Sequence, residues 1–166
     1  MRYRIEDGFD VSTDRYWDMF FDETYNTALF EHLGIDRELI ELTRTGEGLD
    51  RSIHRRQRLT PRREIPAVLQ KFARGAVSYV EDNRLILASN AMEVVTTPSF
   101  LADKFTSRGT YRLESRSGTI VRVWEAECTC HVPFVGGMIE HFVVDEVQAS
   151  YRATTQFTRR WLAEHV

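Results

Sequence analysis

Long apolar stretches are missing from this sequence of 166 residues. The longest run without a formal charge spans residues 128–139, whereas a membrane-spanning helix needs about 18 or more apolar residues. Charged side chains also interrupt residues 1–7, where a secretion signal would need an apolar segment. We therefore expect a soluble, cytoplasmic protein.

Cysteine is scarce: only Cys128 and Cys130 are present, which excludes a framework of disulfides. On a strand the two thiols would share one face and His131 would point the opposite way, so the three groups cannot meet at one ion. Charge of neither sign dominates, because 22 basic and 25 acidic residues give a net charge of −3. This balance leaves no broad basic surface. We therefore predict no metal and no nucleic-acid partner.

Motifs of the common enzyme classes are absent as well. The sequence has no Gly-x-Ser-x-Gly elbow, no phosphate-binding loop, no Gly-x-Gly-x-x-Gly fingerprint and no His-Glu-x-x-His pair. Several polar residues of the expected strands could serve as an acid or a base: His54, Tyr79, Asn90, Glu93 and Tyr111. Their spacing defines no catalytic pair, so the sequence predicts no catalytic residue and no cofactor.

What is present is the pattern of one domain over residues 1–166, since no repeat, linker or low-complexity segment divides the chain. Alternation over residues 3–11 predicts a first strand. Ser12 or Thr13 is a good helix N-cap, and the aromatic residues that follow recur at helical spacing. Two short helices are therefore expected, the second ending at Gly34.

Six more strands are expected as three antiparallel hairpins in meander order. The hairpins cover residues 39–45 with 49–59, residues 76–81 with 85–97, and residues 105–114 with 119–132. The second is expected to turn at Asp82-Asn83. Between the first and second hairpins, residues 65–72 are expected to form a short helix or an irregular cover.

The strongest periodic signal predicts a helix from Met138 to Glu164, about 40 Å long at 1.5 Å per residue. Its apolar stripe contains Ile139, Phe142, Val147 and Tyr151. One helix cannot cover both faces of a sheet, so we predict an α+β fold in which a curved antiparallel sheet wraps around the C-terminal helix. Curvature of this kind opens a space between strands and helix, where ligand pockets are common.

The segment Val132–Glu140, followed by a helix ending at Phe157–Leu162, resembles the last strand and C-terminal helix of the START-like, helix-grip (SRPBCC) superfamily. That superfamily includes carriers of the birch-pollen-allergen type, polyketide cyclases and lipid-transfer domains. Within it the chain is similar to a bacterial family of unknown function that has Tyr-Val-Glu in a middle strand, here Tyr79-Val80-Glu81. The resemblance implies a helix-grip fold, and because this superfold hosts carriers and enzymes alike, it does not decide the function.

Parity along the strands predicts which side chains border the cavity. We expect it to be lined by residues that face the helix, or that face back from it: Asn90, Met92, Tyr111, Trp124, Phe142 and Tyr151. Arg55 is expected at the polar end, because it alone among the strand cations shares a face with apolar Ile53 and Leu59. A buried arginine needs an anionic partner, so Arg55 should matter mainly for acidic ligands.

These features predict a protein that binds a hydrophobic small molecule or lipid. Such a protein could also transport the bound molecule. One alternative is a polyketide cyclase- or dehydratase-like enzyme that uses the same cavity. Another is a protein-interaction module that uses the basic run at residues 51–63. The outward arginines of that run could make transient contact with a membrane surface, or could form a solvated face balanced by nearby acids.

Overall fold

A computed structural model describes residues 1–65, 67–71 and 75–165. Seven strands form one antiparallel sheet in the order β1-β7-β6-β5-β4-β3-β2. The strands are β1 (Arg2–Phe9), β2 (Ile35–Thr45), β3 (Ser52–Pro61), β4 (Tyr79–Ile86), β5 (Ala91–Pro98), β6 (Phe105–Arg116) and β7 (Thr119–Cys130). The helices are α1 (Thr13–Phe20), α2 (Glu23–His32), α3 (Ala67–Gln70) and α4 (Gly136–Glu164).

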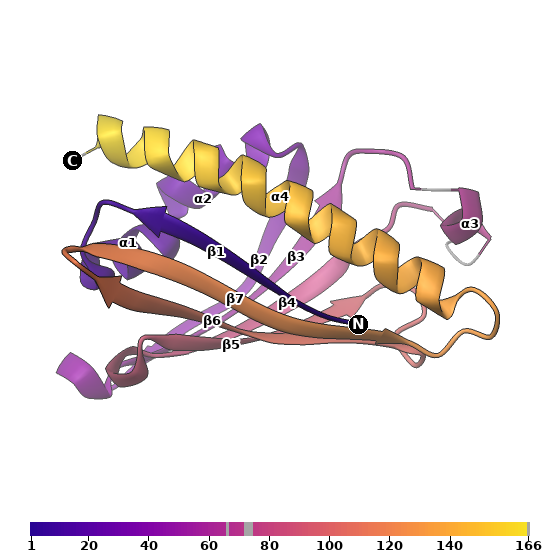
Figure 1. Ribbon diagram of the computed structural model, residues 1–166, viewed down its shortest axis with the longest axis horizontal. Coiled ribbons are helices and arrows are strands. Elements are labelled where there is room, and N and C mark those ends of the chain that lie inside the picture. The colour runs from indigo at the N-terminus through magenta and orange to yellow at the C-terminus, as the bar shows by residue number, and fades with distance from the viewer. Residues whose placement is uncertain (66, 72–74, 166) are drawn as a thin grey trace.

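The sheet is curved, and α4 runs along its concave side from one end of the molecule to the other (Figure 1). Helices α1 and α2 lie at the end where α4 finishes, and α3 lies near the end where α4 begins (Figure 1). This arrangement confirms the predicted α+β class, with a sheet curved around the last helix and two short helices after the first strand. None of the helices in the described ranges is long and apolar enough to cross a membrane.

Local sequence signals explain both short helices. The Ser12 hydroxyl accepts a hydrogen bond from the backbone N–H of Arg15 and so caps α1. Asp22 caps α2 in the same way, through the N–H of Tyr25 at 2.8 Å. Gly34 follows α2 with a φ of 65°, a backbone conformation in which glycine has no steric penalty.

The predicted turn at Asp82-Asn83 is wrong. Both residues lie inside β4, where they pair with β3 on one side and with β5 on the other. The chain turns instead just after a short 3₁₀ segment at Leu87–Ser89, and Asn90 takes the left-handed conformation there with a φ of 48°. Two continuous ladders of backbone hydrogen bonds outweigh the turn preference of an Asp-Asn pair.

The inward face of β7 is arranged as parity predicts. Trp124, Ala126, Cys128 and Cys130 are buried, and His131 is exposed. The expected cover over residues 65–72 is described only in part: α3 lies within it, whereas Pro66 and Phe72 lie outside the described residues.

Candidate functional site

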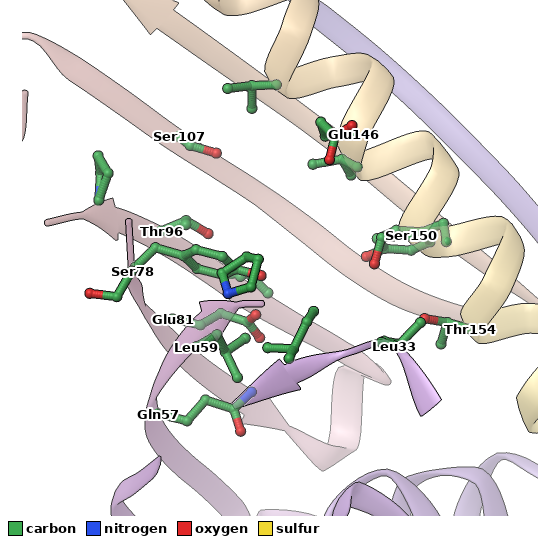
Figure 2. Close-up of a pocket in the computed structure, with 18 of the residues that line it drawn as sticks. Leu33, Gln57, Leu59, Ser78, Glu81, Thr96, Ser107, Glu146, Ser150 and Thr154 are labelled. Atoms are coloured by element: carbon green, nitrogen blue, oxygen red, sulfur yellow. The ribbon is translucent and has the colours of Figure 1, made fainter. Parts of the chain in front are cut away.

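A cavity of about 330 Å³ lies between the inner face of the sheet, helix α2 and helix α4 (Figure 2). Its walls are mostly apolar, with side chains from β3 to β7 on one side and from α4 on the other. This is the space that sheet curvature leaves under a helix resting mainly on β7 and β1.

Six of the seven residues predicted to line a cavity do line it: Arg55, Met92, Tyr111, Trp124, Phe142 and Tyr151. Three of these form one row across the sheet, since Tyr111 pairs with Met92 on one side and with Trp124 on the other. Asn90 is not among the lining residues. It lies in the turn before β5, where its side-chain oxygen accepts a hydrogen bond from the indole N–H of Trp17 at 3.2 Å.

Aromatic side chains close the part of the cavity nearest α1. The rings of Trp124 and Tyr151 stack with centroids 6.0 Å apart, and the hydroxyls of Tyr16 and Tyr111 are 2.5 Å apart. Burial raises the pKa of Tyr111 and of Tyr151 well above the ordinary value for tyrosine. Both phenols are therefore neutral at physiological pH and can offer a ligand only a neutral hydroxyl.

Arg55 is 2% exposed, and its guanidinium is bonded to the protein. Nε donates to the Asn83 side chain at 3.1 Å, and Nη1 donates to the Phe20 carbonyl at 3.1 Å and to the Asn26 side chain at 3.2 Å. The guanidinium also lies over the ring of Phe20, 4.7 Å from its centroid. Burial lowers the pKa of Arg55 to about 10, against the opposing charge of Glu81.

Arg122 also points inward, although the sequence provided a reason to face inward only for Arg55. Arg122 is 1% exposed, forms an ion pair with Asp7, and donates to the Thr155 hydroxyl at 2.6 Å. Its guanidinium lies 4.7 Å from the centroid of the Tyr151 ring. The signal was in the sequence, because residue 122 has the same parity on β7 as Trp124.

Glu81 is a lining residue that the sequence reasoning missed. Its carboxylate accepts a hydrogen bond from the Asn83 amide at 2.8 Å, and Asn83 in turn accepts from Arg55. A chain of hydrogen bonds thus runs from a buried cation through an amide to a carboxylate at the cavity wall. Tyr79 and Glu81 both lie in the expected strand 76–81 and share its parity, so the alternation along that strand could have identified Glu81.

The outward part of the basic run is paired with acids. Arg58 forms an ion pair with Glu38, and Arg56 lies 3.5 Å from Asp82. Arg62 bonds both Glu31 and Asp36. This pairing favours the solvated, charge-balanced face over a basic contact surface.

Within the described ranges, no group of three or more His, Cys, Asp or Glu side chains is placed to hold a metal ion. Cys128 and Cys130 are both free and buried.

The curved antiparallel sheet, the two helices after β1 and the long α4 define the helix-grip class, and solved structures of that class share the fold. TTHA0849 from Thermus thermophilus is similar with a TM-score of 0.65 and 15% identity over 100% of both chains. Norcoclaurine synthase from Thalictrum flavum, in complex with dopamine and hydroxybenzaldehyde, gives 0.57 and 15%, covering 100% of this chain and 88% of the other. The Zhui aromatase/cyclase from Streptomyces sp. R1128 gives 0.52 and 12%, covering 96% of each chain.

The chain belongs to the family described as "Protein of unknown function (DUF2505)", whose model matches residues 5–162. No curated protein matches the sequence.

Proposed function

We propose that this protein binds a hydrophobic small molecule or lipid in the cavity between the sheet and α4. The observation that carries the proposal is the cavity itself. Its volume of about 330 Å³ and its mostly apolar walls fall in the range of about 300–1,000 Å³ that is typical of small-molecule sites. A neighbour in fold was solved in complex with dopamine and hydroxybenzaldehyde, which supports the binding of small organic molecules by a protein of this fold.

In this proposal Met92, Trp124 and Phe142 supply apolar contact, while Tyr111 and Tyr151 add aromatic surface with a hydroxyl group. Burying about 300 Å² of apolar ligand surface would contribute about 7 kcal/mol at about 25 cal/mol per Å². Micromolar affinity needs about 8 kcal/mol, and ordering of the ligand offsets part of the gain from apolar burial, so polar contacts must add to this burial for a well-fitting compound to bind at micromolar concentration.

Replacement of Trp124 tests the proposal. Trp124→Ala removes a large part of the cavity wall and should weaken the binding of a fluorescent lipid probe by about tenfold or more. Phe142→Ala, on the opposite wall, should act in the same direction and guards against a folding defect of the first variant. Val95→Ala is the matched control, because Val95 is 47% exposed on the outer face of β5. A wild-type protein that binds no apolar probe at micromolar concentration would contradict the proposal.

A second experiment identifies the natural ligand. The purified protein is extracted with organic solvent, and the extract is analysed by mass spectrometry. We expect a stoichiometric apolar compound that is depleted from the Trp124→Ala variant.

The second candidate function is a cyclase- or dehydratase-like enzyme, and Glu81 is the observation that favours it. A carboxylate oriented by Asn83 at an apolar wall could move a proton to or from a bound substrate. Turnover of a polyketide-like compound that is lost in Glu81→Gln would establish the enzyme. If the compound is recovered unchanged from the wild-type protein, the result would favour the ligand-binding function over the enzyme.

Five statements remain predictions from the sequence. They are transport of the ligand, transient contact with a membrane surface, a cytoplasmic location, the lack of a nucleic-acid partner and a single-domain organisation.

A further inference from the structure

A row of hydrogen-bonding side chains crosses the otherwise apolar sheet wall of the cavity. The row follows the strand register from β3 to β6, each member paired with the next: Gln57, Glu81, Thr96 and Ser107. Helix α4 presents polar residues at intervals of four toward the same space: Glu146, Ser150 and Thr154. Figure 2 shows both sets with the cavity between them. Glu146 is paired with Arg63, and Glu81 and Gln57 each bond one protein group, so a purely hydrocarbon ligand would leave the remaining hydrogen-bonding capacity of this row unused.

Gln57 is 1% exposed, and the orientation of its amide is fixed. Its oxygen accepts a hydrogen bond from Nε of Arg37 at 2.8 Å, and because arginine can only donate, the amide nitrogen must point the other way. In Figure 2 that nitrogen lies on the side of Glu81 and the oxygen on the opposite side. The nitrogen is buried and has no hydrogen-bond partner among the described residues, which costs about 1–3 kcal/mol.

The hydrogen bonds of Glu81 can be assigned in a similar way. The Asn83 oxygen accepts from Arg55, so the Asn83 nitrogen is the atom that donates to Oε1 of Glu81. Among the described residues no cation lies within 4.0 Å of the Glu81 carboxylate. Glu81 is half-buried at the cavity wall, so its second oxygen is available as an acceptor.

Gln57 and Glu81 face each other directly across β3 and β4, and the Cβ atoms of such pairs lie about 4.5–5.5 Å apart. Resting on the ligand-binding function proposed above, we propose that this pair holds a hydroxyl group of the ligand. The hydroxyl donates to the Glu81 carboxylate and accepts from the Gln57 amide nitrogen. A hydroxyl satisfies both groups with a single oxygen, whereas a ketone cannot donate to Glu81 and an ammonium cannot accept from Gln57.

An anionic ligand is disfavoured at the same place. The two buried arginines near the cavity already bond protein groups, Arg55 to Asn83 and Arg122 to Asp7 and Thr155. Arg55 bonds only neutral groups, but it reaches Glu81 through Asn83 and, among the described residues, no cation lies within 4.0 Å of the Glu81 carboxylate. A ligand carboxylate held by Glu81 and Gln57 would therefore meet the Glu81 carboxylate directly and be repelled by it.

The test uses pyrene, 1-hydroxypyrene and pyrene-1-carboxylate, which share one fluorescent ring system. The wild-type protein should bind 1-hydroxypyrene about tenfold more tightly than pyrene, as expected for a hydrogen bond to a charged group, and should bind the carboxylate more weakly than pyrene. Glu81→Gln should remove most of the hydroxyl preference and raise the affinity for the carboxylate. Gln57→Met should reduce the hydroxyl preference without favouring the carboxylate. Affinity for pyrene itself reports whether the cavity of each variant is intact.

The matched control is Glu93→Gln, which removes a carboxylate from the exposed side of β5 and should change none of the three affinities. If the wild-type protein binds pyrene as tightly as 1-hydroxypyrene, or if the preference survives in both cavity variants, the hydroxyl site is wrong while the ligand-binding function stands. If the wild-type protein binds none of the three compounds at micromolar concentration, the proposed function fails and the hydroxyl site fails with it.

Discussion

Cys128 shows how a single side chain responds to the interior of this protein. It is 0% exposed, its sulfur lies 3.9 Å from the Glu140 carbonyl oxygen, and burial raises the pKa of its thiol. Because the thiolate is the reactive form, Cys128 should react with iodoacetamide far more slowly in the folded protein than in guanidinium chloride. A labelling time course followed by mass spectrometry measures both rates.

The unfolded protein is the control, since both cysteines should label quickly there. Rapid stoichiometric labelling of Cys128 and Cys130 in the folded protein would show that β7 does not turn this face toward α4.

Also at the residue scale, parity identified six lining residues but not the polar row of Gln57, Glu81, Thr96 and Ser107. Met92, Tyr111 and Trp124 follow from the alternation of apolar residues, which is a local property of each strand. The partners of Arg55 do not, because Phe20 and Asn26 come from α1 and α2, far away in the sequence. Hydrogen bonds between distant elements depend on tertiary packing, which periodicity does not describe.

Among the elements, the junction between β7 and α4 makes a sharp prediction for two adjacent glycines. A Cβ atom at Gly136 would clash with the backbone carbonyl of Cys130, whereas one at Gly137 would meet nothing within 4 Å. Gly136→Ala should therefore lower the free energy of unfolding by about 1–3 kcal/mol. Gly137→Ala should be neutral or slightly stabilising, because alanine has the higher helix propensity.

Urea denaturation of the two variants measures this difference, and each serves as the control for the other. Equal effects would mean that α4 does not begin against Cys130. The two glycines are indistinguishable in the sequence, so only the packing of the helix start separates them.

Elements with one strong period were predicted well, and so were the turns of the first and third hairpins, but the turn of the second hairpin was not. The apolar stripe of α4 predicted a helix from Met138, within two residues of the observed start at Gly136. The turn at Asp82-Asn83 failed because neighbouring strands on both sides of β4 decide where that strand ends. A local turn signal contains no information about those neighbours.

For the molecule as a whole, buried tyrosines predict a loss of stability at alkaline pH. Burial raises the pKa of Tyr25, Tyr111 and Tyr151. The unfolded chain loses these phenolic protons near pH 10 and the folded protein does not, so the unfolded state binds fewer protons and stability falls as pH rises. Burial raises the pKa of Tyr3 and Tyr79 as well. Arg55, with its pKa lowered to about 10, acts in the opposite direction but is one group against five.

The net slope above pH about 10 should approach about 5.5 kcal/mol per pH unit, from five tyrosines at about 1.4 kcal/mol each less one arginine. Urea denaturation from neutral to alkaline pH measures it, with tyrosinate absorbance as a control that the phenols ionise on unfolding. A free energy of unfolding that does not change over this range would contradict the burial of these residues.

At this scale the α+β class and the strand meander could be predicted, because one long helix after many strands leaves few compact arrangements. The size and polarity of the cavity could not be. They depend on how far the sheet curves and on which of many inward side chains meet a partner.

The position of α4 in the chain has a consequence for synthesis. All seven strands leave the ribosome before this helix of 29 residues, and translation of those residues takes about 1.5–6 s at about 5–20 residues per second. During that interval α4 does not yet cover the nascent sheet, and the apolar concave side of the sheet faces the surrounding solution. β1 pairs with β7, which is the last strand to be synthesised, so β1 stays unpaired until then. In this state the nascent chain can bind chaperones or a hydrophobic ligand before α4 packs on the sheet and encloses the cavity.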